Sequence, residues 1–500
     1  MPTEITADGQ VIPPRNITQP APVLDTRAFQ WRGLDTSSET QSADDHEEKQ
    51  NQTPLVAINL LLPGQRVPPP SAQSLPTAPQ RVISEEDMLR KQLGIDKIHE
   101  GRLPFPLEHF HGSYAGNGFN MIFRPNKFDG GPKVDGDNGI NDNILELNLT
   151  TEQWTFGPTI GDIPNRGFGT EPTIILGGMP YLQTVQNVTN LDTGKGDSLL
   201  TNKPNGIHLE PGVFLFVPES SSTKGKKSIV RMASIPHGTT INAQGLVPVP
   251  NALKPPFTGK TIFSNSVIDT TPFSIGNPSS RLPQFFTSMN ADRPNPFREP
   301  SDLSKFNTSK TGSGRITSET IKNPNKVLEK ALEGQNITNV ISFDLSTGPS
   351  QSKGSATLNG GGISNISFLN GPQSTITSAA PTLADNPNAH AEFFTNRWWV
   401  ETVLYEVKLK GPLKPNETVR EVWATMPRGS LAPTPVFNVT APGNGVNIKG
   451  DFSVRVPGVQ LQYSQTVNLN FGGLTWPHVS VATLVPTTPQ PVLLPGPRGP

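Results

Sequence analysis

Short runs in which apolar and polar residues alternate strictly constrain the fold of this chain more than any other feature. In NILELNLT (143–150), Leu145, Leu147 and Leu149 alternate with polar residues, and VISFDLST (340–347) repeats the pattern. Successive side chains of a β-strand point to opposite faces, so each run predicts a strand with one buried face. From about residue 107 onward, Gly, Pro and Asn separate such runs, which favours an all-β fold.

We expect about ten strands. Two of them, GVFLFVP (212–218) and the run WWVETVLYEV (398–407), are apolar on both faces and are therefore expected to be covered on both sides. The polar TTEQ segment (150–153) is expected to turn the chain. The expected strands are 119–124, 143–150, 212–218, 228–235, 340–347, 363–369, 397–409, 418–425, 459–470 and 479–485.

One clear helix is predicted over 324–333. NPNKVLEKALEG has Asn323 as N-cap, Pro324 at the first helical position and Gly334 as the stop signal. The predicted organisation is a disordered Pro-rich arm (1–82), a short helix and lead-in (83–104), a barrel domain (105–485) with an irregular surface insertion (246–315), and a Pro-rich tail (486–500).

Composition excludes several classes of function. The chain has no cysteine, which rules out disulfides, thiolate metal sites and cysteine nucleophiles. Lys and Arg number 41 against 42 Asp and Glu, without a long basic stripe, so nucleic acid is not expected as a partner. There is no signal peptide pattern and no apolar run of about 20 residues, so we expect a cytoplasmic protein without a membrane span.

Several segments together resemble one known family. HGSYAGNGFNMIFRP (111–125) is similar to the Gly-x-Trp-x-Gly-x-Gly opening strand of calycin-type barrels, with Tyr114 in place of the Trp. The resemblance extends to IPNRG, SIVRMASIPHGTTINAQG and LQYSQTVNLNFGGLTWPHVSVATL, and covers about 107–484. It implies an antiparallel barrel of the lipocalin and fatty-acid-binding (FABP-like) kind, and a haem-binding, nitrobindin-like function. The interior of such a barrel can be packed or open to a ligand.

Two histidines are expected to face each other across a hairpin. If GVFLFVP pairs with SIVRMASI through the intervening loop, paired residue numbers sum to about 445, which places His208 opposite His237. The pair, with Glu210 nearby, can bind a metal such as Zn or Fe(II), or one histidine can serve as a single haem ligand. The alternative is structural: His237 hydrogen-bonds carbonyl groups at the Pro-His-Gly corner.

His478 is the second candidate haem ligand. Nitrobindin-like barrels take their proximal histidine from near the end of the chain, and the resemblance therefore implies this role for His478. The alternative is a histidine on the outer face of the last strand.

Arginines among apolar residues indicate an anionic partner. Arg124 and Arg231 are expected in hydrophobic strands, and an unpaired buried charge is costly. A haem propionate or a fatty-acid carboxylate would satisfy a guanidinium by two hydrogen bonds. The alternative is an internal pair with Glu146 or Glu210.

Together these patterns predict a binding protein that holds an amphipathic anionic small molecule, haem or a lipid-like ligand, in a barrel cavity. The expected ligand-contacting residues are His478, His237, His208, Arg231, Arg124 and Tyr114. A haem-dependent peroxidase-like enzyme and a structural or interaction protein with a packed barrel remain as alternatives. The usual hydrolase, P-loop and dinucleotide motifs are absent from the sequence.

Overall fold

A computed structural model gives the architecture of the chain. It describes residues 103–125, 143–189, 205–220, 225–250, 252–280, 316–348, 361–366, 389–427, 432–471 and 474–495. The expected arm (1–82) and the expected helix within 83–104 lie outside these residues.

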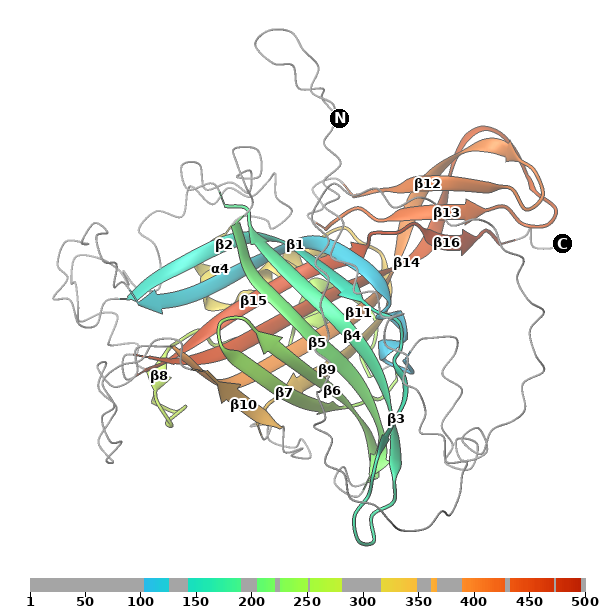
Figure 1. Cartoon of the computed structure of the whole chain (residues 1–500). Helices are drawn as coiled ribbons and strands as arrows, with labels where there is room; N and C mark the ends of the chain where they lie inside the picture. Colours follow the sequence, from blue (N-terminus) through green and yellow to red (C-terminus); the bar gives the residue numbers. More distant parts are fainter. Residues whose placement is uncertain are drawn as a thin grey trace, which may run out of the picture. The chain divides into compact units, whose positions relative to one another are not determined.

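The core of the molecule is a closed barrel of ten antiparallel strands (Figure 1). In spatial order the strands run β7, β6, β5, β4, β2, β1, β15, β14, β11 and β9, and β9 closes the ring by pairing with β7 at Ser346 and Gln244. Their bounds are β1 Gly112–Pro125, β2 Asn143–Phe156, β4 Ile174–Asn187, β5 Asn205–Ser220, β6 Lys226–Ile235, β7 Thr239–Leu246, β9 Ile337–Ser346, β11 His390–Leu413, β14 Val446–Phe471 and β15 Leu474–Pro486.

Glycine permits the closure of the barrel at the seam between β7 and β9. A Cβ atom on Gly245 would overlap the backbone carbonyl oxygen of Asp344. The two backbones can therefore approach this closely only because residue 245 has no side chain.

Strand β11 buries both of its faces, as its doubly apolar run predicts. On β5 the inward Phe214 is buried, but the opposite face of the run 212–218 is only half-buried. On β11, Trp398 points into the barrel while its neighbour Trp399 points outward into a second core. Leu147 and Leu149 of the alternating β2 run share one face, as expected, and that face is the outer one. The inner and outer cores therefore use alternate residues of the same strands.

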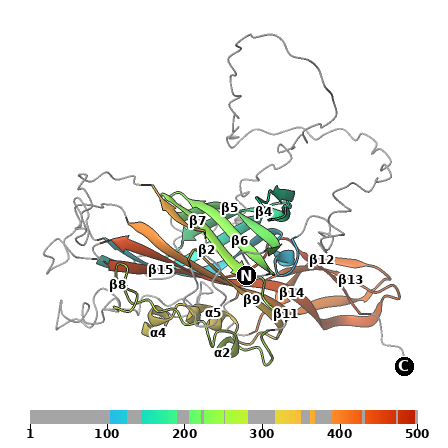
Figure 2. The same cartoon turned by 90° about the horizontal axis from the view of Figure 1, so that it is seen from below.

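The outer core is covered by short helices (Figure 2). Ile262 of α2 (Gly259–Ile262), Ile321 of α4 (Ser318–Lys322) and Leu328 of α5 (Asn325–Ala331) are buried against the outer face of the barrel. The predicted helix is α5, although its N-cap is Pro324 rather than Asn323. The insertion at 246–315 is thus more than a surface loop, because its described part supplies α2 and buried side chains.

One end of the barrel is closed by a plug. The 3₁₀ helix η2 (Leu107–His109) leads into Phe110, whose ring packs edge-on against Phe156, Phe214 and Trp398 at centroid distances of 5.0 to 5.6 Å. Phe110 and Leu107 are almost completely buried. The residues just before β1 therefore seal the interior from this side.

The long strands β11 and β14 continue past the barrel and carry a small additional sheet (Figure 1). β12 (Thr418–Thr425) pairs with β11, β13 (Val436–Thr440) pairs with β12, and β16 (Gln490–Leu493) adds to β13 in parallel. The expected Pro-rich tail at 486–500 therefore contains a strand. Three further short strands extend the sheets at other edges: β3 Gly161–Asn165, β8 Phe273–Ser274 and β10 Gly362–Asn365.

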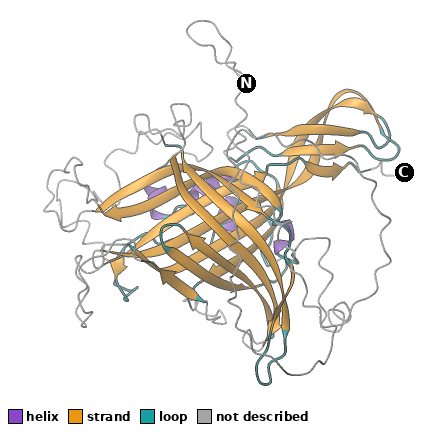
Figure 3. Cartoon of the chain, viewed as in Figure 1, coloured by secondary structure: helices purple, strands orange, loops and turns teal. Residues whose placement is uncertain are grey.

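The all-β class and the barrel are confirmed, and strands dominate the described residues (Figure 3). The expected turn at TTEQ is wrong, because β2 runs through it without interruption to Phe156. Strands β4 and β7 were not predicted. In β4 the inward Gln183 interrupts the apolar alternation, and in β7 the inward face has only Ile241 and the small Ala243 as apolar side chains, which makes its alternation weak.

The plug makes a testable contribution to stability. Replacing Phe110 with alanine leaves a cavity among buried rings, and we expect a loss of about 3–5 kcal/mol in the free energy of unfolding, measured by urea denaturation. The matched control is Phe168→Ala. Phe168 is 95% exposed, so its change is expected to stay within about 0.5 kcal/mol. Equal losses in the two variants would contradict the plug.

Candidate binding site inside the barrel

A buried ion pair occupies the centre of the barrel. Arg231 on β6 and Glu210 on β5 have no exposed side-chain surface, and Arg231 Nη2 lies 2.5 Å from Glu210 Oε1. Arg231 Nε also donates to Tyr181 Oη at 2.8 Å, while Nη1 donates to the side-chain oxygens of Asn396 and Gln465 at 3.0 and 2.9 Å. Every guanidinium nitrogen therefore has a partner within the protein.

Aromatic rings surround this ion pair. The Arg231 guanidinium carbon lies 5.1 Å from the Trp154 ring centroid and 5.3 Å from that of Phe394. Trp154 in turn contacts Trp398 and Tyr463 at centroid distances of 5.0 and 5.6 Å. Burial by itself would raise the pKa of Glu210, but the Arg231 charge together with the contacts of His208 and Tyr181 outweighs it and lowers the pKa to about 2. The centre is thus a packed, charge-balanced core.

Of the two internal partners expected for Arg231, the structure has Glu210. The side chain of Glu146 lies outside the described part of the chain, as does that of Arg124. Because Glu210 neutralises Arg231, an anionic ligand is not needed to balance its charge. A ligand-contacting role for Arg231 stays a prediction.

A second buried carboxyl, that of Glu152 on β2, is held by hydrogen bonds and forms no ion pair within the described residues. It accepts hydrogen bonds from Tyr463 at 2.5 Å, from Gln183 at 3.3 Å and from Thr150 at 3.3 Å. Burial raises the pKa of Glu152 despite these hydrogen bonds. Gly118 leaves room for it, because a Cβ there would lie 2.8 Å from Glu152 Oε1. This explains one glycine of the calycin-like opening strand.

A ladder of asparagines fixes the protonation of His478. The backbone N–H of Thr189 donates to Asn187 Oδ1, Asn187 Nδ2 donates to Asn148 Oδ1, and Asn148 Nδ2 donates to Asn120 Oδ1. Asn120 Nδ2 lies 2.9 Å from His478 Nε2. A backbone N–H can only donate, so the direction of the whole ladder is set at Thr189 and His478 Nε2 must accept.

His478 is therefore neutral, with its proton on Nδ1. Burial, followed by the charges of His208 and His237, lowers the pKa of His478 to about 3. The side chain is half-buried, so part of its surface stays accessible to water. The alternative of an outer-face histidine is wrong, because the partners of His478 are the inward-pointing Asn120 and its ladder.

The expected hairpin register is confirmed. Gly212 pairs with Ala233 and Phe214 with Arg231, so paired numbers sum to 445. Beyond the last of these pairs, the rings of His208 and His237 stack with centroids 6.1 Å apart. His208 Nε2 lies 3.2 Å from Glu210 Oε2, and His237 Nε2 lies 3.3 Å from the Ile207 carbonyl oxygen. The structural role foreseen for His237, bonding a backbone carbonyl, is thus present.

His208, His237 and His478 define what we call the histidine end of the barrel. Its inward apolar residues are slightly exposed, at 5% for Val185, 8% for Ile235 and 9% for Val467, whereas the aromatic centre is at or near zero. The plug at Phe110 lies at the opposite end of the barrel. Phe110 contacts Phe156, whereas the asparagine ladder uses Asn148, which lies eight residues earlier on the same strand, β2. The apolar residues of the histidine end are therefore slightly less enclosed than the aromatic centre.

The remaining predicted residue, Tyr114, belongs to the plugged end. It is almost fully buried, its hydroxyl donates to the His109 carbonyl oxygen at 2.6 Å, and its ring packs against Phe156. Tyr114 therefore helps to hold the plug and lies apart from the histidine end. Sequence reasoning missed Asn120, Asn148 and Glu152, because a polar residue that points into a barrel looks in the sequence like a polar turn residue.

The arrangement of these residues bears on the two expected cofactors, a metal ion and haem. Within the described part of the chain, no group of three or more His, Cys, Asp or Glu side chains is placed to hold a metal ion; the His208 and His237 metal pair stays a prediction. For haem, His478 is neutral, as an iron ligand must be, but its Nε2 already accepts from Asn120. Coordination of iron by Nε2 would break its hydrogen bond with Asn120. Coordination by Nδ1 would move the proton to Nε2 and reverse the ladder. The asparagine ladder therefore does not fit iron ligation by His478.

Comparisons with known proteins find no matching family model, no matching curated protein and no matching solved structure. The calycin-like architecture therefore rests on the barrel itself. Among the described helices, none combines the length and apolarity needed to cross a membrane.

The central ion pair predicts a coupled effect on stability. Arg231→Met and Glu210→Gln each leave the other group without its principal partner, and we expect losses of about 3–5 kcal/mol in unfolding free energy at neutral pH. The double variant should lose less than the sum of the two, as measured by urea unfolding in a double-mutant cycle. Arg455→Met, at an exposed position on β14, is the control. Additive losses would contradict the coupling.

The ladder predicts a histidine that does not titrate near neutrality. In long-range ¹H–¹⁵N NMR spectra, His478 should stay neutral between pH 5 and 8, with Nε2 as the unprotonated nitrogen. Because its folded pKa of about 3 lies below the ordinary histidine pKa of 6.5, protonation favours the unfolded chain, and His478 lowers the stability as the pH falls below 6.5. Asn120→Leu should free Nε2 and mix the tautomers. A midpoint near 6.5 in the unaltered protein would refute the assignment.

Proposed function

We propose that this protein binds an amphipathic small molecule at the histidine end of its barrel. The observation that carries the proposal is His478: a neutral imidazole with accessible surface, held inside the barrel by a directional asparagine ladder. A side chain fixed in one tautomer presents one defined donor, Nδ1–H, which suits a ligand with an acceptor oxygen such as a carboxylate or carbonyl.

The surroundings support an apolar ligand body. Val185, Ile235 and Val467 are the slightly exposed apolar residues of this end, and the polar groups His208 and Ser480 lie among them. A mostly apolar site with a few fixed polar groups is the usual form of a small-molecule pocket. A fatty-acid-like molecule matches this arrangement better than haem does, since its head group needs a donor rather than a free acceptor nitrogen.

A packed barrel that acts through its surface is the second candidate. The filled centre favours it, because Trp154, Trp398 and Phe214 have essentially no exposed surface and leave the deep interior to protein atoms. The two candidates differ only in whether the histidine end takes up a ligand.

Titration calorimetry with oleate tests the proposal. We expect oleate to bind the unaltered protein and His478→Phe to weaken binding at least about tenfold, because the donor is lost while the ring volume is kept. His111→Phe replaces an exposed histidine just before β1 and should bind as the unaltered protein does. Equal binding in both variants would move the ligand away from His478.

Haemin is the second probe in the same experiment. A Soret band that disappears in His478→Ala or His237→Ala would restore the haem expectation, and peroxide-dependent turnover would then favour the peroxidase-like alternative. If neither oleate nor haemin binds the unaltered protein, the packed-barrel candidate stands instead.

A further inference from the structure

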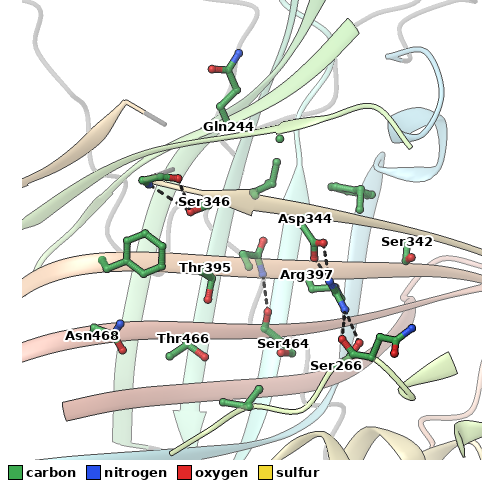
Figure 4. Close-up of a pocket in the computed structure, with 18 of the residues that line it drawn as sticks. Gln244, Ser266, Ser342, Asp344, Ser346, Thr395, Arg397, Ser464, Thr466 and Asn468 are labelled. Atoms are coloured by element: carbon green, nitrogen blue, oxygen red, sulfur yellow. Dashed lines mark hydrogen bonds and ion pairs between the residues drawn. The ribbon is translucent and has the colours of Figure 1, made fainter. Parts of the chain in front are cut away.

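A groove of about 1130 Å³ runs along the outside of the barrel, between the outer faces of β9, β11 and β14 and the chain that follows β7 (Figure 4). It is separate from the histidine end. Its lining residues on β11, such as Thr395 and Arg397, alternate with the inward-pointing Asn396 and Trp398, so the groove and the barrel interior lie on opposite faces of one sheet.

The floor of the groove consists of small polar side chains on three neighbouring strands. Other parts of the outer face are apolar and covered by helices, but here most outward positions carry a hydroxyl, an amide or a charge, with the aromatic Phe393 as an exception. The hydroxyl and amide residues of the floor are Ser342, Ser346, Thr395, Ser464, Thr466 and Asn468.

Three of these side chains are sheltered without being used by the fold, whereas Ser346 Oγ donates to the Gly348 carbonyl oxygen at 3.0 Å. Thr395, Thr466 and Asn468 are only partly exposed, yet their polar side-chain atoms make no hydrogen bond within the described part of the chain. A polar group that is partly withdrawn from water and has no protein partner leaves its donors and acceptors available to a ligand or to ordered water.

An ion pair holds the opposite wall in place. Arg397 binds both carboxylate oxygens of Asp344, and its Nη1 donates to the Asn265 carbonyl oxygen at 3.0 Å and to Ser266 Oγ at 2.6 Å. Arg397 therefore ties the chain at 265–266 to the sheet. The groove has a rigid floor and an anchored wall, and it does not depend on a ligand to form.

The charges of the lining select against anions. Three acidic residues, Asp269, Asp344 and Glu392, line the groove against a single basic one, Arg397, which Asp344 already neutralises. Hydroxyl and amide groups both donate and accept hydrogen bonds, and neighbouring strands place them about 4.8 Å apart. Phe393, also in the lining, adds an aromatic ring. This chemistry matches a chain of neutral, hydroxyl-bearing rings.

We propose that the outer groove is a binding site for a neutral oligosaccharide. The floor hydroxyls and Asn468 exchange hydrogen bonds with the sugar hydroxyls, and Phe393 packs against an apolar ring face. The site is independent of the ligand proposed for the barrel interior, so failure of one proposal does not affect the other.

Binding is tested by NMR on the full ¹⁵N-labelled chain with maltotetraose, cellotetraose and mannotetraose, and with tetragalacturonic acid as the anionic counterpart. We expect at least one neutral tetrasaccharide to bind and the acidic one to bind more weakly. In Thr395→Val with Thr466→Val, which keeps side-chain shape and removes two hydroxyls, the dissociation constant should rise at least about tenfold.

The control is Thr425→Val, which removes an exposed hydroxyl on β12 and should leave the dissociation constant unchanged. Unchanged thermal unfolding of the double variant shows that it is folded. The proposal is overturned if none of the three neutral sugars binds at millimolar concentration, if tetragalacturonic acid binds best, or if the double variant binds as the control does.

Discussion

The ion pair between Arg231 and Glu210 is the interaction on which the interior of this barrel depends. A guanidinium without exposed surface can be tolerated only if its charge and its donors are matched, and here Glu210, Tyr181, Asn396 and Gln465 together provide the match. These residues come from five strands, β4, β5, β6, β11 and β14, on different sides of the ring. The pair therefore links strands that do not neighbour one another and specifies how the barrel closes around its centre.

This central pair also divides the interior into two unlike ends. On one side, Phe110 and the rings of Phe156, Phe214 and Trp398 pack as an ordinary apolar core, which excludes both water and ligand. On the other side, amides and imidazoles replace the rings, and the asparagine ladder orders their hydrogen bonds in one direction. Asparagines joined in sequence across β4, β2 and β1 make His478 a donor of fixed orientation. A binding role fits this end because its polar groups are positioned before any ligand arrives.

The polar interior also explains where sequence reasoning succeeded and failed. Where a strand faces apolar surroundings on at least one side, as at Leu147 and Leu149 or at Trp398 and Trp399, its pattern was visible and the prediction was confirmed. Thr150 and Glu152 instead look like part of a turn, but they point into the barrel, where Tyr463 and Gln183 satisfy the carboxyl. A polar inward residue and a polar turn residue are indistinguishable until the partner strand is known.

The sequence by itself determined the all-β class, the register of the β5 and β6 hairpin with its facing histidines, the helix at 324–333 and the need of Arg231 for an acidic partner or an anionic ligand. These follow from local periodicity, from loop arithmetic and from the cost of burying a charge. Only the tertiary structure decided that Glu210 is that partner, that His478 points inward as a neutral donor, and that Tyr114 supports a plug. The hydrogen-bonded residues are 21 positions apart for Glu210 and Arg231, 28 for Asn120 and Asn148 and 358 for Asn120 and His478, and no local pattern records which strand will supply the other half of a hydrogen bond.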